Sequence, residues 1–347
     1  AWGRLHPGRG PVVVLTGTDL YRDIRIDPAA RRSLDLAQAL VVLQECAPEA
    51  LPAEVRGKSR VIFQSTATRQ TLAKSPARLR AVMVGHLRDA GIVLPGVRAF
   101  EIGTGWYPTF PFACYLAGAA RVTTYDLNPH LRMDLTLQCA DILGGFLPRI
   151  ANAAGVPLAE VEKRHRALVE RLRTGADLGV ATGGVIDYRA PADATRSLLP
   201  DGDVDVVFSN SVLEHVPPEV IDAMYAESMR VLSPRGVMFH SVNCGDHYAY
   251  VDRNVHQLNY LRYSDEEWQR WNNAFLYQNR LRAHWFVDGA RRHGFDIDLD
   301  TRTTREERMK QLAAMPVHPQ FADVPAEQLC ITSVDFIARK PASTTAG

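Results

Sequence analysis

Lysine is scarce in this sequence of 347 residues, and neither sign of charge dominates it. Only five of the 40 basic residues are lysines, and the excess of arginine suggests a GC-rich genome. Because 39 acidic residues nearly balance the basic ones, the formal net charge is +1. Proteins that bind nucleic acids usually carry a basic excess, so we expect no nucleic-acid partner.

Cysteine is also scarce, and no two cysteines form a C-x-x-C pair. The five cysteines are Cys46, Cys114, Cys139, Cys244 and Cys330. Their odd number and wide spacing argue against a disulfide framework or a zinc knuckle and favour a reduced, cytoplasmic setting. No apolar run approaches the length of a membrane span, and the first residues lack the apolar core of a signal peptide. We therefore expect no association with a membrane.

Residues 1–75 differ in pattern from the rest of the chain and are expected to form an accessory domain. A short β-branched run at 12–15 predicts a strand, and apolar periodicity from 32 to 46 predicts a helix. This domain is expected to cover a cleft, to self-associate, or to bind a pathway enzyme.

From residue 76 to 347, strand and helix patterns alternate, which is the signature of a parallel sheet covered on both faces. The predicted strands lie at 97–102, 121–125, 185–186, 204–208, 236–242, 297–299 and 329–338, and the predicted helices at 76–90, 109–116, 130–147, 158–172, 218–232 and 283–293. The predicted fold class is α/β, a doubly wound, Rossmann-like sheet of seven strands whose last two strands form an antiparallel edge.

A glycine loop follows the first of these strands, with Glu101, Gly103 and Gly105 placed before a helix. Glycines at such a turn let the backbone approach a ligand without a Cβ in the way. A dinucleotide-binding loop requires a third glycine where this chain has Pro108. S-adenosylmethionine (SAM) carries no phosphate, so it fits this loop better than a nicotinamide dinucleotide does.

Acidic residues stand at two further strand boundaries. Asp126 ends the next strand and can accept hydrogen bonds from both hydroxyls of a ribose. Asp193 precedes the fourth strand and can accept from an adenine amino group, and that strand ends at Asn210, beside the methyl group to be transferred. The residues expected to bind the cofactor are Glu101, Gly103, Thr104, Gly105, Asp126, Leu127, Asp193, Ala194 and Asn210.

Taken in order, these motifs resemble the class I SAM-dependent methyltransferases over about residues 76–340. The resemblance rests on the glycine loop, Asp126, Asp193-Ala194, the Val-Leu-Glu-His segment ending at His215, and the segment from Arg230 to Gly236. It implies SAM as cofactor and S-adenosylhomocysteine as product, with the loop at the methionine end of SAM, Asp126 at the ribose and Asp193-Ala194 at the adenine. The bulky Trp106-Tyr107-Pro108 departs from the small residues usual after the second glycine.

The acceptor is expected at the end of the fifth strand, where Asp246 and His247 are the predicted catalytic residues. A protonated amine cannot attack a methyl group, so a residue that holds the amine and takes its proton is the natural catalyst. The residues expected to bind the substrate are Tyr107, Glu214, His215, Asn243, Tyr248 and Asp252. No metal site is expected, because His240, Asp246, His247, Asp252 and His256 match no standard ligand spacing, and His240 is expected in the core.

The segment of about 243–280 is expected to be a substrate-binding insertion, because long loops in compact domains are usually functional. Its carboxylates, amides and aromatic rings suit a small, polar acceptor. In overall plan the chain resembles small-molecule methyltransferases of bacterial natural-product pathways, especially aminoglycoside N-methyltransferases such as that of gentamicin biosynthesis. This resemblance implies N-methylation of an amino sugar in antibiotic biosynthesis. The alternatives are an O-methyltransferase of a sugar or phenol and a non-catalytic SAM-binding scaffold.

Overall fold

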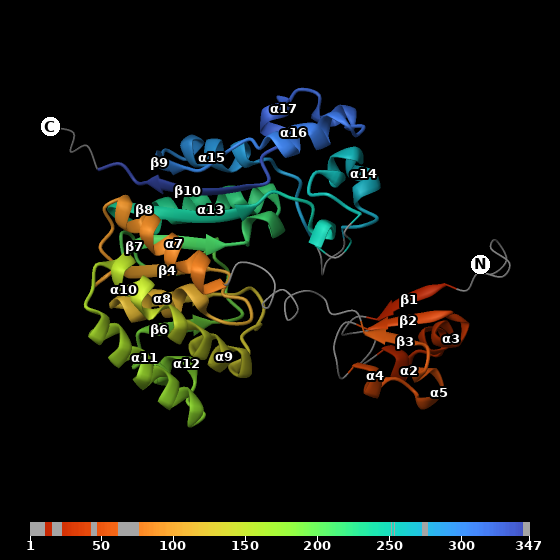
Figure 1. The fold of residues 1–347 in the computed structure, drawn as a ribbon, viewed down its shortest axis with the longest axis horizontal. Coiled ribbons are helices and arrows are strands. Elements are labelled where there is room, and N and C mark those ends of the chain that lie inside the picture. The colour runs from red at the N-terminus through yellow and green to blue at the C-terminus, as the bar shows by residue number, and fades with distance from the viewer. Residues whose placement is uncertain are drawn as a thin grey trace. The chain divides into compact units, whose positions relative to one another are not determined.

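The computed structural model describes residues 11–15, 23–42, 47–61, 76–250, 252, 254–272 and 277–342. The chain divides into two compact units, Ala1–Ser75 and Pro76–Gly347, and each is described by itself. Figure 1 shows the strands and helices of both units.

The first unit contains a parallel sheet of three strands in the order β1-β2-β3. Its elements are β1 (Val12–Leu15), α2 (Ile24–Ile26), α3 (Pro28–Leu36), β2 (Ala39–Val42), α4 (Ala47–Ala50), α5 (Ala53–Arg56) and β3 (Ser59–Val61). The strand at 12–15 is confirmed, but the predicted helix at 32–46 is wrong for 39–42, where the apolar run pairs with β1. The helix lies earlier because Asp27 accepts from the backbone N–H of Ala29 at 2.8 Å and caps it. The rest of that prediction, 43–46, lies outside the described residues.

The second unit is built on a seven-stranded sheet in the order β6-β5-β4-β7-β8-β10-β9. Its strands are β4 (Arg98–Ile102), β5 (Arg121–Tyr125), β6 (Ile186–Arg189), β7 (Val204–Asn210), β8 (Leu232–Asn243), β9 (Asp296–Asp300) and β10 (Ser333–Arg339). The first five are parallel, whereas β10 runs antiparallel to both of its neighbours. This is the class I methyltransferase fold, and the predicted fold class and antiparallel edge are confirmed.

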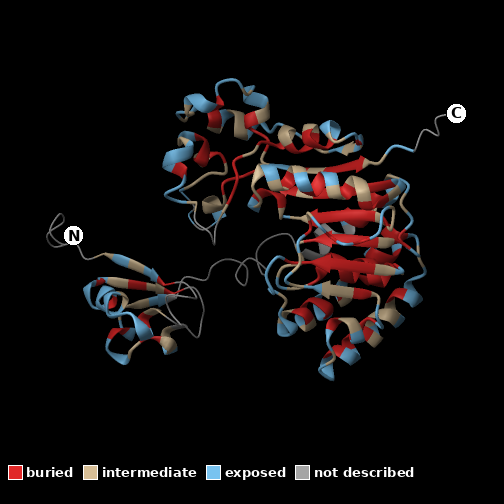
Figure 2. Cartoon of the chain, turned by 180° about the vertical axis from the view of Figure 1, so that it is seen from behind, coloured by how far each residue is buried: buried red, intermediate tan, exposed pale blue. Residues whose placement is uncertain are grey.

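Helices cover both faces of this sheet, and the buried residues concentrate in the strands between them (Figure 2). The helices are α7 (Pro76–Asp89), α8 (Thr109–Ala117), α9 (Met133–Leu143), α10 (Leu147–Ala154), α11 (Leu158–Arg173), α12 (Leu178–Ala181), α13 (Pro218–Val231) and α15 (Ala283–Arg292). Successive strand residues point to opposite faces, so Ala99 packs with the α7 to α12 side and Phe100 with α13 and α15. The predicted helix at 130–147 is divided, because the glycines of the 3-10 turn Gly144–Phe146 end α9.

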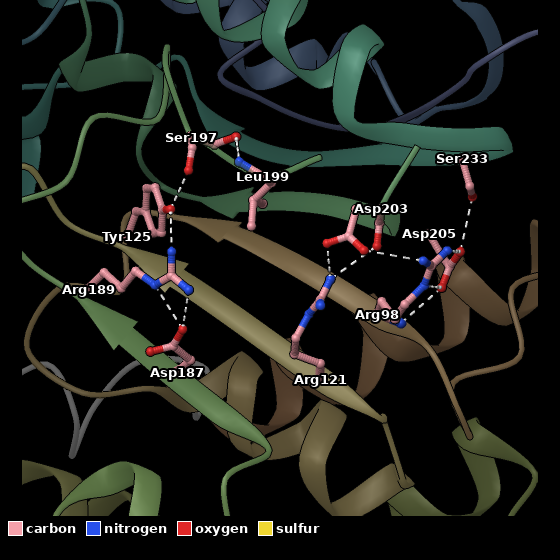
Figure 3. A network of polar contacts seen from close by, with 10 residues as sticks. All are labelled: Arg98, Arg121, Tyr125, Asp187, Arg189, Ser197, Leu199, Asp203, Asp205 and Ser233. Carbon is pink, nitrogen blue, oxygen red and sulfur yellow. Dashed lines mark hydrogen bonds and ion pairs between the residues drawn. The ribbon is translucent and has the colours of Figure 1, made fainter. Parts of the chain in front are cut away.

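Ion pairs join the strands at their amino ends, the edge opposite the predicted site (Figure 3). Arg98, the first residue of β4, donates to Asp205 of β7 from its side chain at 2.8 Å and from its backbone at 3.0 Å. Arg121, the first residue of β5, pairs with Asp203, which directly precedes β7. These contacts fix the register of the central strands, and therefore the level at which their carboxyl ends stop.

Two segments beyond the sheet form a small additional core. It comprises Leu258, Tyr260, Leu261, Trp268, Leu312, Phe321, Leu329 and Cys330. The helices that contribute to this layer are η4 (His247–Tyr250), η5 (Asn259–Arg262), α14 (Asp265–Trp268), α16 (Glu306–Ala313), η6 (Pro319–Phe321) and α17 (Ala326–Leu329). Part of the expected insertion at about 243–280 thus packs against 306–330, a segment in which no helix was predicted. The strand predicted at 329–338 is wrong for 329–332, because Leu329 ends α17 and the strand begins at Ser333. None of the helices in the described part of the chain is long and apolar enough to span a membrane.

Candidate functional site

The candidate site lies where the adjacent parallel strands β5, β4, β7 and β8 end. Each strand is followed by residues that were expected to bind a ligand: Asp126 after β5, the glycine loop after β4, Glu214 after β7 and His247 after β8. Ligands of open α/β sheets bind at this carboxyl edge. The predicted residues fall into a cofactor side at β4 and β5 and an acceptor side at β7 and β8.

The glycine loop requires its glycines for two different reasons. Gly103 (φ +79°) and Gly105 (φ +70°) both adopt the left-handed region that disfavours a side chain. At Gly103 a Cβ would also lie 2.6 Å from Cγ2 of Val212, whereas at Gly105 nothing lies within 4 Å. Close packing of the β4 and β7 loops therefore leaves no room for a side chain at Gly103.

Hydrogen bonds hold the acidic end of this loop. Glu101 is buried, and Thr124 of the neighbouring strand donates its hydroxyl to Oε2 of Glu101 at 2.5 Å. The hydroxyl of Thr104 contacts the same Thr124 hydroxyl. The loop backbone is thus tied to β5 before any ligand binds.

Asp126 connects the glycine loop to the strand beyond it. Its carboxylate accepts from the backbone N–H of Gly105 at 3.1 and 3.2 Å and from the hydroxyl of Tyr188 at 3.0 Å. Burial raises the pKa of Asp126, while these two donors oppose the rise. Two carboxylate oxygens offer more lone pairs than these contacts use, so Asp126 can also accept from a diol. Tyr188 was not predicted, because the strand predicted at 185–186 extends to Arg189 in the structure and so includes it.

The residues predicted to bind the adenine of SAM lie on a loop beside Asp126. Ala192 donates its backbone N–H to the carbonyl of Asp126 at 2.9 Å. Asp193 is exposed and accepts from the backbone of Thr195 at 2.8 Å, while Ala194 is buried. The loop is tied to β5 again because Tyr125 donates its hydroxyl to the carbonyl of Ser197 (Figure 3).

Two other predicted cofactor residues differ in exposure. Leu127 is 71% exposed, so its apolar side chain is available to a ligand at the carboxyl edge of the sheet. Asn210 is half-buried at the end of β7 and pairs with Ser241 of β8.

The acceptor side brings together Glu214, His215 and His247. One ligand atom from each of the three side chains lies within 4.8 Å of the others. The two imidazole rings are 5.0 Å apart between centroids, and the ring of Tyr250 lies 5.3 Å from that of His247. Glu214 and His215 were predicted as substrate-binding residues and His247 as catalytic, and the structure places all three in one cluster.

Glu214 supplies the carboxyl group of this cluster. The residue is 1% exposed, and neither carboxyl oxygen makes a hydrogen bond of normal geometry within the described residues. Burial raises its pKa to about 8, and the backbone amides of Glu214 and Asn243 offset the rise only in part. A buried carboxylate without a cationic partner is costly, so this group favours a ligand that brings positive charge.

His215 is held in one tautomer by the backbone. Its Nδ1 lies 2.7 Å from the carbonyl of Tyr277, which can only accept, so Nδ1 carries the proton and Nε2 presents a lone pair. Although His215 is exposed as a whole residue, burial of its ring lowers its pKa. The ring is therefore neutral near pH 7 and available as an acceptor.

Two residues at the end of the expected insertion, neither of them predicted as a site residue, assemble this cluster. Asn279 donates its side-chain N–H to the carbonyls of Leu213 and Val216 at 2.7 and 2.8 Å. Gln278 accepts from the backbone of His247 at 3.2 Å and donates to the carbonyl of Gly245 at 2.7 Å. The sequence signal is a pair of amide residues shortly before a helix, which gives no indication of what they bind.

Asp246 directly precedes His247 but is not one of the three residues of the cluster. It is fully buried, and its carboxylate accepts from the backbone of Tyr248 at 2.8 Å and from the side chain of Asn259 at 3.1 Å. Burial raises its pKa, and these donors oppose the rise. These contacts fit a residue that shapes the loop, and a role for Asp246 as base stays a prediction.

The remaining predicted substrate residues do not enter the cluster. Asn243 contacts the hydroxyl of Tyr250 and closes the loop after β8. Tyr248 and Asp252 line a cavity of about 230 Å³. The other residues around this cavity are Val255, Asn259, Tyr263, Trp268 and Trp271. Tyr107 packs partly against the core on the α8 side. As expected, His240 is a core histidine that contacts Ser209 at 2.7 Å.

Replacing Gly103 by alanine is expected to weaken SAM binding by about tenfold or more. The left-handed backbone costs roughly 1–2 kcal/mol with a Cβ, and relieving the contact with Val212 adds about 1–3 kcal/mol of strain or displaces the loop. Denaturant unfolding and calorimetric SAM titration measure the two effects. Gly91→Ala is the control, because Gly91 has φ +80° but no atom within 4 Å of an added Cβ. Equal SAM affinity in the wild type, Gly103→Ala and Gly91→Ala would contradict a cofactor role for this loop.

Comparisons with known proteins agree with the fold. The family described as "Methyltransferase domain" matches residues 164–240, which run from α11 into β8. No curated protein sequence matches the chain.

Several solved structures of methyltransferases are similar at low identity. A SAM-dependent methyltransferase from Mesorhizobium loti is 16% identical, over 73% of this chain and 95% of that one, with a TM-score of 0.40. The geranyl diphosphate C-methyltransferase of Streptomyces coelicolor A3(2) is 14% identical, over 76% and 81%, with a TM-score of 0.41. The magnesium protoporphyrin IX methyltransferase of Synechocystis PCC 6803 is 14% identical, over 80% and 89%, with a TM-score of 0.42.

Proposed function

We propose that this chain is a SAM-dependent methyltransferase that methylates an amino group of a small, polar molecule. The methyltransferase-domain match and the sheet order support the reaction class. The cofactor fit rests on the glycine that tolerates no Cβ and on a buried carboxylate with spare lone pairs at the end of β5. S-adenosylmethionine, when bound, supplies a methyl group activated on a sulfonium.

The observation that supports an amine as the acceptor is the environment of the Glu214 carboxyl group. This group is buried at the carboxyl edge, its oxygens make no hydrogen bond of normal geometry among the described residues, and two imidazoles adjoin it. A protonated amine supplies the missing positive charge and the missing donors together. Glu214 can then take the proton that the amine must lose before its lone pair attacks.

The transfer itself needs few groups. The amine nitrogen forms a bond to the methyl carbon while the carbon–sulfur bond breaks, which leaves S-adenosylhomocysteine and a methylated amine. Glu214 holds the proton released from nitrogen, and the neutral Nε2 of His215 can accept a second N–H of the same amine. The remaining work is positioning, which Gln278 and Asn279 provide by fixing the two loops.

An amino sugar is the acceptor class that we propose. The cavity beside Tyr248 and Asp252 presents aromatic rings and a carboxylate, groups that suit a polyhydroxylated, cationic ring. A hydroxyl acceptor on a sugar or phenol is the second candidate, because a neutral His215 can also take a hydroxyl proton.

Product masses test the proposal. The protein is incubated with SAM and with kanamycin- and gentamicin-type amino sugars, with sugars and phenols that lack amines, and without acceptor. A gain of one methyl group on amines alone supports the proposed acceptor, and a gain on hydroxyl compounds alone replaces it with the second candidate. SAM binding without any methylated product across a broad acceptor panel would favour a SAM-binding scaffold.

Asp246→Asn is expected to lower kcat by less than about tenfold, because Asp246 acts through the loop and not on the acceptor. Asparagine keeps the acceptor for Tyr248 but perturbs the contact with Asn259, so the free energy of unfolding falls by roughly 1–3 kcal/mol. The acceptor KM is expected to change more than kcat. If kcat instead falls as far as in Glu214→Gln and its pH profile shifts, Asp246 is the base.

A further inference from the structure

The cluster of Glu214, His215 and His247 has the composition of a metal site. Two imidazoles and one carboxylate arise from the ends of β7 and β8, with one ligand atom of each inside a 4.8 Å limit. The spacing of these residues in the sequence predicts no metal site, and the proposed methyl transfer does not require a metal. We propose that these three residues bind one divalent transition-metal ion, and that this ion competes with the acceptor amine for the Glu214 carboxylate.

The donor set agrees with this class of ion. Two histidines and a carboxylate are the protein ligands of catalytic zinc sites that keep one position open, and the same set suits other first-row divalent ions. Zinc bonds of about 2.0–2.1 Å place tetrahedral ligand atoms about 3.3 Å apart. The three atoms already lie within 4.8 Å of one another, so an ion requires only a small further approach of the ligand atoms.

The surroundings orient the ligands as in metal sites. A metal-binding histidine usually donates its other ring N–H to a carbonyl or carboxylate, which fixes the tautomer. His215 makes this contact with the carbonyl of Tyr277, so its Nε2 lone pair is the one available. Asn279 donates its backbone N–H to the carbonyl of Glu214, and Gln278 accepts from the backbone of His247. All three ligands are thus attached to one segment, 277–279.

The metal ion and the acceptor amine are expected to compete because both bind the buried carboxyl group of Glu214. Glu214 has no hydrogen-bond partner of normal geometry among the described residues, so it can hold either an ion or an ammonium group. The two cations compete, because the one that binds first neutralises the carboxylate and so removes most of its attraction for the other. The metal-binding part of the proposal stands without the methyl transfer, whereas the competition rests on the proposed amine acceptor.

Cobalt binding tests the site directly. Tag-free protein is stripped with a chelator and titrated with Co²⁺, whose visible absorption reports coordination by nitrogen and oxygen ligands. One ion per chain is expected, with affinity reduced by at least about tenfold in Glu214→Gln and in His247→Asn. The control is His318→Asn, which removes a histidine outside the cluster and keeps an acceptor for the backbone of Gln320. Circular dichroism confirms that each variant is folded. Equal affinity in wild type and both cluster variants would overturn the proposal.

Zinc inhibition tests the competition separately. With an amine acceptor, Zn²⁺ is expected to raise the acceptor KM while leaving the SAM KM unchanged, and a chelator restores activity. Bound metal that leaves methyl transfer unaffected overturns the competition and leaves the proposed function intact. A requirement for the metal also overturns the competition, and it points to a hydroxyl acceptor. Methyl transfer without metal binding overturns the metal site alone.

Discussion

Glu214→Gln lowers kcat by about 10²–10⁴-fold in metal-free buffer, if Glu214 is the group that takes the acceptor's proton. Glutamine keeps the size of the side chain but neither neutralises an ammonium group nor accepts a proton from it. The affinity for SAM is expected to stay within a few-fold, because Glu214 lies on the β7 side of the edge and not beside Asp126. Steady-state kinetics with the amine acceptor and calorimetric titration of SAM measure the two quantities.

Measuring the free energy of unfolding of Glu214→Gln shows whether its loss of activity is due to unfolding. Burial raises the pKa of Glu214 from 4.5 to about 8, so its contribution to stability is fully present below pH 4.5 and is lost as pH rises to about 8. Each unit corresponds to about 1.4 kcal/mol, so wild type loses on the order of a few kcal/mol across this range. Glu214→Gln removes the ionisable group and is expected to be the more stable protein at pH 8. A variant that is less stable at pH 8 and inactive would leave the role of Glu214 unsupported.

The fold of the larger unit followed from the sequence because its signals are local. Apolar runs that stop at polar or glycine residues, and helices that start at proline or carry one apolar face, predicted all seven strands and most helices of the sheet. Several boundaries were less accurate, since the strands predicted at 185–186 and 329–338 lie at 186–189 and 333–339. The first unit was harder: its second strand, Ala39–Val42, follows directly on a helix, and only pairing with β1 distinguishes it from a continued helix. Periodicity over so short a run does not separate the two structures.

The two sides of the candidate site differed in how far they could be predicted. The cofactor side depends on residues at the ends of neighbouring strands, and strand order places Asp126 beside Gly105 without further information. The acceptor side depends on loops, and loops are positioned by tertiary contacts. Nothing in the local sequence distinguishes Asp246, which is buried under its loop, from His247, which joins Glu214. The roles of Gln278 and Asn279 are equally invisible, because amide side chains have no characteristic spacing.

Asp126→Asn weakens SAM binding by about 10–100-fold while kcat at saturating SAM changes little. Hydrogen bonds from hydroxyls to a charged acceptor contribute about 1.5–3 kcal/mol, and an asparagine offers one acceptor and a donor that faces the ribose hydroxyls. Asparagine still accepts from Gly105 or Tyr188 through Oδ1, so the loop is expected to keep its shape. Calorimetric titration of SAM and of S-adenosylhomocysteine gives the affinities.

Asp187→Asn is the matched control, since Asp187 lies on the neighbouring strand β6 and pairs with Arg189 at 2.7 Å without contacting the glycine loop. If Asp126→Asn and Asp187→Asn bind SAM as wild type does, the ribose does not lie at Asp126 and the cofactor side is misassigned. If Asp126→Asn affects only SAM affinity while Glu214→Gln affects only kcat, the carboxyl edge has two separable halves. That separation is expected because the β4 and β5 loops hold the cofactor, whereas the β7 and β8 loops hold the group that accepts the methyl.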